Sequence, residues 1–141
     1  MKALNQLRED LRNLDTDPLI LKHLIRIIIQ QTQGFEIKMF NTTTTSTENM
    51  DVIKVLIACN EQQKIGNWNL LKGILTIEFK YCQAEYWKQK GRVRNVDNWM
   101  RNVIKALHVF SVTIWKERSA YVTEVEKINQ ETRLRQHSKQ I

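Results

Sequence analysis

Helix breakers are scarce along this chain. Its 141 residues include one proline and four glycines. Because sheet proteins need frequent turns rich in these residues, their scarcity favours long helices over many short strands. The length fits one domain, and a domain of this size buries enough surface to fold without disulfides or metal ions. The sequence therefore predicts a single all-α domain over residues 1–141.

Apolar residues at steps of three and four define the predicted helices. A stripe of four leucines marks the first, over residues 2–14. The second is expected over 18–31, where Pro18 suits the first helical position. Its isoleucines also allow a strand, but its length favours a helix. Further helices are predicted over 49–64, over 68–90 and from 97 to about 137. The expected fold is an antiparallel bundle of four or five helices with a long C-terminal helix.

Two segments are expected to lie outside the packed bundle. Residues 34–47 contain the run Asn41-Thr42-Thr43-Thr44-Thr45-Ser46-Thr47, a low-complexity composition typical of a flexible loop. The last helix, at 1.5 Å per residue, would be about 60 Å long, which exceeds the needs of a compact bundle. Residues 129–141 are therefore predicted to project as a basic tail or to pack on a partner.

Positive charge is concentrated after residue 87. Residues 1–87 hold 10 basic and 10 acidic residues, whereas residues 88–141 hold 12 and 5, which accounts for the whole net charge of +7. Such a basic half suggests an anionic partner. Six cations lie close together in the sequence and form the predicted nucleic-acid-binding site: Lys88, Lys90, Arg92, Arg94, Arg101 and Lys105.

Aromatic residues accompany these cations. Tyr86, Trp87 and Trp99 lie at the same helix–helix junction, where exposed rings would stack on unpaired bases while the cations neutralise phosphates. The alternative is that Tyr86 and Trp99 belong to the core and the cations only keep the protein soluble.

Adjacent large residues suggest a second kind of partner. Neighbouring residues on a helix cannot both face the same core, so one member of the pair Tyr86–Trp87, and one of Ile114–Trp115, is expected to face a partner or a second layer. The predicted interaction residues are Trp87, Trp115, Arg118 and Tyr121.

No metal or cofactor site is expected. Cys59 and Cys82 are 23 positions apart and the histidines His23, His108 and His137 are scattered, without ligand spacing. Free thiols suit an intracellular location, in the cytoplasm or nucleus. The polar start shows no signal peptide, and the apolar run over 19–29 carries charges and is too short to span a bilayer. No membrane partner is therefore predicted.

A series of short motifs runs along most of the chain. It comprises Thr16-Asp17-Pro18, residues 61–66 with Trp68, Leu71-Lys72-Gly73, Gln83 with Tyr86, Trp99 with Val103-Ile104, and residues 115–118. This order resembles a helical region of uncharacterised mobile-element proteins of algae and diatoms, some of which lie at the end of reverse-transcriptase-like reading frames. The resemblance implies no assigned activity.

The last motif of that family continues as Arg-Asn-x-x-x-His, which looks like the motif of helical HEPN ribonucleases. There the arginine contacts phosphate and the histidine assists attack by the RNA 2′-hydroxyl. Here Arg118 is followed by Ser119 and Thr123 in place of the asparagine and histidine. Threonine cannot exchange a proton near neutral pH, so the resemblance implies a non-catalytic member. Arg101 and His108 give a second, looser match, with a surface arginine as the simpler interpretation.

Three functions follow in order of preference. The first is a non-catalytic accessory protein that binds RNA or DNA through the basic junction. The second is a structural module that forms a homo-oligomer or one subunit of a larger assembly. The third is a HEPN-type ribonuclease. Salt-dependent binding to nucleic acid would separate the first two.

Overall fold

The computed structural model describes the backbone of residues 2–33 and 50–139. It describes the side chains of these ranges up to residue 135. The loop predicted over 34–47 lies outside the described residues. Six helices and no strand occur in the described ranges: α1 Lys2–Asn13, α2 Pro18–Gln33, α3 Met50–Ile65, α4 Trp68–Leu71, α5 Ile77–Gln89 and α6 Val96–Lys139. The predicted all-α class and the long last helix are confirmed.

The helix predicted over 68–90 is in fact two helices. After α4, Gly73 adopts a left-handed conformation (φ 84°), and the chain is not helical again until Ile77. Gln62 of α3 holds the connection, because its amide nitrogen donates to the carbonyl oxygen of Ile74 (2.9 Å) and its amide oxygen accepts from the N–H of Thr76 (3.0 Å). The apolar spacing continues across this break, so the pattern alone does not reveal it.

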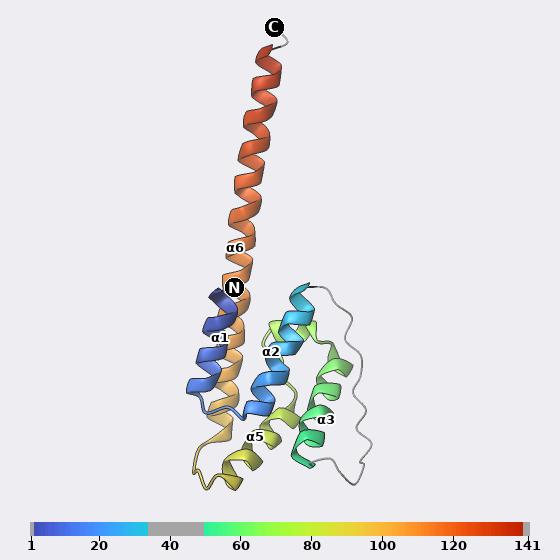
Figure 1. Ribbon diagram of the computed structural model, residues 1–141, viewed down its shortest axis with the longest axis vertical. Helices are drawn as coiled ribbons and strands as arrows, with labels where there is room; N and C mark the ends of the chain where they lie inside the picture. Colours follow the sequence, from blue (N-terminus) through green and yellow to red (C-terminus); the bar gives the residue numbers. More distant parts are fainter. Residues whose placement is uncertain (1, 34–49, 140–141) are drawn as a thin grey trace.

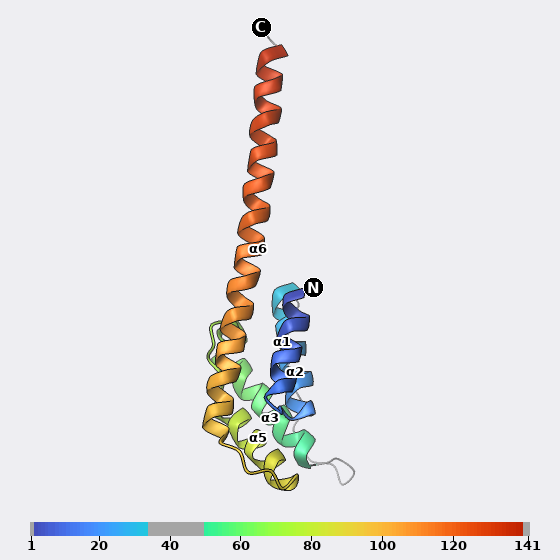
Figure 2. The ribbon, with the colours of Figure 1, turned by 90° about the vertical axis from the view of Figure 1, so that its left-hand side faces the viewer.

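The helices surround a common core (Figures 1 and 2). α1 packs along the first half of α6 and runs in the opposite direction, while α2 lies beside α1, and α5 packs against α3 and α6. α2 and α3 point the same way (Figure 1), so the helices do not all alternate in direction. The largest fully buried apolar side chains are Trp99, Phe79, Leu7, Leu11, Ile20, Leu24, Ile27, Ile28, Leu70 and Leu107.

Only the first half of α6 packs on the bundle. Trp99, Val103, Leu107 and Phe110 are buried, whereas residues 115–135 are exposed apart from two half-buried positions. α1 has 12 residues and begins beside this point, since Lys2 and Glu117 line the same small cavity. The remaining helix therefore projects beyond the bundle (Figure 1), and it does so from residue 115 rather than 129.

None of the helices described here is both long and apolar enough to cross a membrane.

Candidate functional site

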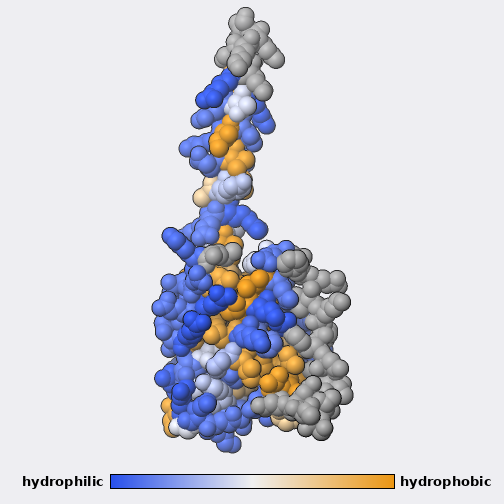
Figure 3. All heavy atoms as spheres, viewed as in Figure 1, coloured by the Kyte–Doolittle hydropathy of each residue, from blue (hydrophilic) through white to orange (hydrophobic). Residues whose placement is uncertain are grey.

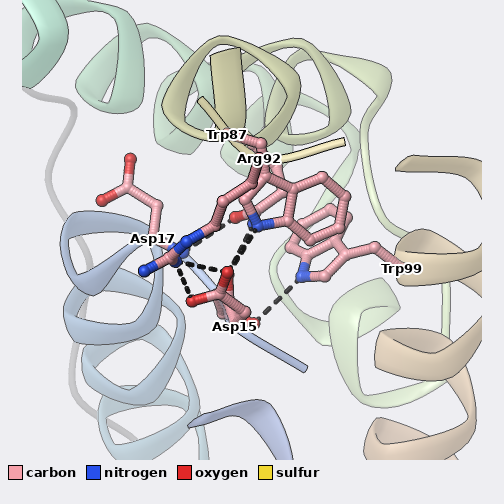
Figure 4. Close-up of polar contacts among 7 residues, drawn as sticks. Asp15, Asp17, Trp87, Arg92 and Trp99 are labelled. Atoms are coloured by element: carbon pink, nitrogen blue, oxygen red, sulfur yellow. Dashed lines mark hydrogen bonds and ion pairs between the residues drawn. The ribbon is translucent and has the colours of Figure 1, made fainter. Parts of the chain in front are cut away.

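Side chains from far along the chain hold the turn between α1 and α2 (Figure 4). Asp15 has a left-handed φ of 56°, a conformation that aspartate tolerates better than most residues. Gln83 of α5 donates to the Asp15 carbonyl oxygen at 2.9 Å and accepts from the N–H of Asp17 at 2.8 Å. The indole N–H of Trp87 donates to the same carbonyl at 3.0 Å. α5 thus satisfies the backbone groups that the turn leaves unpaired.

The side chains of the turn are bonded as well. Arg92 forms an ion pair with the Asp15 carboxylate, and the Trp99 indole N–H donates to the Thr16 hydroxyl at 2.9 Å (Figure 4). Asp17 accepts from the N–H of Leu19 at 2.9 Å and caps α2. Burial raises the pKa of Asp17, while hydrogen bonding to Asp15 raises the pKa of Arg92. The motif Thr16-Asp17-Pro18 is therefore a joint between helices.

The expectation that Trp87 contacts a partner is wrong. Only 4% of its surface is exposed, because the ring turns inward to bond the Asp15 turn. Trp99 is buried too, which agrees with the alternative that it belongs to the core. Tyr86 remains half-buried, with Lys90 Nζ 6.0 Å and the Arg92 guanidinium carbon 5.9 Å from its ring centre. Trp87 and Trp99 therefore offer no open face on which a base could stack.

The six predicted nucleic-acid-binding cations are all exposed. Lys88, Lys90, Arg92 and Arg94 occupy the end of α5 and the loop after it, and the Arg94 guanidinium lies 5.9 Å from the Trp87 ring. Arg101 and Lys105 lie on α6, each about 200° round the helix from buried Val103, and so form a second group on its outer side. In the described part of the chain, Arg92 is the one member of the six in an ion pair.

An apolar groove of about 710 Å³ lies where α6 leaves the bundle. The end of α2, α4 and α6 line it, and Figure 3 shows apolar surface gathered there. Two tryptophans flank it, Trp68 (53% exposed) and Trp115 (68%), and its charged lining residues, Lys72 and Arg118, are both basic. The groove is also lined by Ile29, Leu71, His108, Phe110 and Ile114.

The groove unites motifs that are distant in the sequence. Trp68, Leu71 and Lys72 come from the short motifs over 61–73, and Trp115 and Arg118 come from the motif over 115–118. Trp115 and Arg118 were predicted as interaction residues. Trp68 was not, although its place directly after the Gly66-Asn67 break, at the start of a short helix, leaves a large ring with little helix to bury it.

Past Ile114, which packs against the core, the same face of α6 has no neighbour among the described residues. Ile114, Tyr121, Val125 and Ile128 follow buried Phe110 at steps of four, seven, four and three, so they stay on one side of the helix. Tyr121 is 71% exposed and Ile128 53%. We call these four residues the apolar seam. Val122 (48% exposed) widens it on the side that faces the groove.

The HEPN-like residues all lie on α6. The Thr123 hydroxyl donates to the carbonyl of Ser119 at 2.9 Å on the projecting helix. Arg118 and His108 line the groove, whereas Arg101 does not. Cys59 and Cys82 are free thiols whose pKa burial raises to about 11. Across the described ranges, no three histidine, cysteine or acidic side chains gather as a metal site would require.

Comparison with protein-family models, curated proteins and solved structures finds no match to this chain.

Proposed function

We propose that the protein is a structural interaction module that binds a protein partner along the apolar seam and the groove at its base. The observation that carries this proposal is the exposure of Tyr121 and Ile128, beside half-buried Val125, on a helix that has left its own bundle. A single helix has no neighbour to cover its apolar face, and most helical stability in proteins comes from covering such a face.

The groove supports the same conclusion. Exposed tryptophans are costly for a monomer and are enriched at interfaces, where a large ring fills a pocket on the partner. Trp68 and Trp115 flank a cavity already lined by Ile29, Leu71 and Phe110. A partner helix that follows the seam would reach this groove without a bend, because Ile114 belongs to both surfaces.

The test is site-specific photo-crosslinking of the full chain in the cells that express it. A photoreactive phenylalanine analogue replaces Tyr121 in the seam or, as a control, Thr123, which lies about 200° away on the same helix. We expect a discrete adduct from position 121 alone, and its loss when Val125→Asp places a charge in the seam. Equal labelling from both positions, or no adduct at 121, would contradict the proposal.

A second function, nucleic-acid binding, is favoured by one observation. Five of the six junction cations are exposed outside any ion pair in the described residues, within a half of the chain that carries all of the net charge. Because the junction rings are buried or covered, this binding would rest on phosphate contacts rather than on base stacking. In either function we propose that the protein is not a catalyst.

A further inference from the structure

The edges of the apolar seam differ in charge. Glu117, Glu124 and Glu131 follow one another at intervals of seven residues, and all three are exposed. With 100° per residue, each lies within about 80° of the seam on the side away from the groove. None of them forms an ion pair with another described residue. The opposite edge, Trp115, Val122 and Asn129, carries no charge.

This pattern disfavours a second copy of the chain as the partner. In an antiparallel pair of α6 helices, matching edges face each other, so glutamates would meet glutamates. In a parallel pair, the same positions of the two chains stack, which would place Arg118 against Arg118 inside the contact. Like charges at such positions destabilise helix pairs.

We propose that the seam binds an amphipathic helix of a different protein, one whose apolar stripe is bordered by lysine or arginine. This inference rests on the proposed interaction function and adds the chemistry of the partner. The basic border would lie along Glu117, Glu124 and Glu131, and the apolar stripe would cover Tyr121, Val125 and Ile128. Electrostatic complementarity of this kind selects partners and orientation more than it adds raw affinity.

Two synthetic helical peptides test the proposal with the full-length protein. They share one apolar heptad stripe and differ only in their borders, which are lysine in one and glutamate in the other. At low ionic strength we expect the lysine-bordered peptide to bind, although the protein has a net charge of +7, and the glutamate-bordered peptide not to bind. A scrambled lysine peptide without a stripe controls for charge alone.

Charge reversal in the protein locates the contact. The double variant Glu124→Lys, Glu131→Lys should weaken binding of the lysine-bordered peptide by about 4- to 30-fold. Glu126→Lys makes the same kind of charge change about 130° round the helix from the seam and should leave binding unchanged. Val125→Asp should abolish binding of the lysine-bordered peptide.

The outcomes separate this inference from the function on which it rests. If the two peptides bind equally through a Val125-sensitive contact, the partner chemistry is wrong and the interaction function stands. If light scattering shows a dimer of the protein alone that Val125→Asp dissociates, the occupant is a second copy and the inference is overturned. If neither peptide binds and the protein stays monomeric, both proposals fail.

Discussion

Two buried glutamines each hold a turn that lies elsewhere in the chain. Gln83 bridges the carbonyl of Asp15 and the N–H of Asp17, while Gln62 bridges the carbonyl of Ile74 and the N–H of Thr76. Gln83→Met keeps the length of the side chain but leaves the N–H of Asp17 unpaired, while the Asp15 carbonyl keeps its bond from the Trp87 indole. We expect a loss of about 1–3 kcal/mol in the free energy of unfolding, measured by urea denaturation.

The matched control for this change is Gln6→Met. Gln6 is exposed and bonds only Asp10 on its own helix, so its replacement should change stability by about 0.5 kcal/mol or less. Similar losses in the two variants would show that water or other side chains replace the bonds of Gln83, and that the joint at Asp15 does not depend on it.

At the scale of elements, Gly73 separates α4 from α5 and lets α4 approach α6. Its φ of 84° disfavours any side chain, and an added Cβ would lie 3.2 Å from Cγ2 of Ile104. Gly91 has a similar φ of 67° with open space around it. Gly73→Ala should therefore lower thermal stability more than Gly91→Ala, which carries only the backbone cost of about 1 kcal/mol. Equal losses would mean that Ile104 moves aside freely.

At the scale of the whole molecule, the excess of positive charge predicts that oligonucleotide binding depends on salt. Replacing Arg94, Arg101 and Lys105 by alanine should flatten the salt dependence of oligonucleotide binding by up to about three units of log–log slope, one for each phosphate contact. Arg92 is kept, because its ion pair with Asp15 belongs to the helix joint. The control removes Lys116, Lys127 and Arg133 from the projecting half of α6, an equal loss of charge. If the wild-type protein has no affinity at low salt, the junction cations serve solubility alone.

Sequence periodicity was sufficient for the helices themselves. The predicted bounds 2–14, 18–31 and 49–64 match α1 at Lys2–Asn13, α2 at Pro18–Gln33 and α3 at Met50–Ile65 to within two residues. The isoleucine-rich segment after Pro18 is a helix, as its length and proline start indicated. These features depend on neighbours a few positions apart, and such neighbours can be read directly from the chain.

Contacts between residues far apart in the sequence decided where the helices break and which side chains are buried. The break after α4 depends on Gln62, and the burial of Trp87 depends on a carbonyl 72 positions earlier in the chain. Folding brings Trp68 and Trp115 to one groove, and the projection of α6 begins at residue 115 because the described parts of α1 and α2 extend no further along it. Apart from the break after α4, the sequence by itself determined which segments are helices and where charge accumulates, since both are local properties. The lengths of helices packed side by side decide which apolar faces are covered and which stay exposed. Because this depends on how distant segments pack, only the tertiary structure decided it.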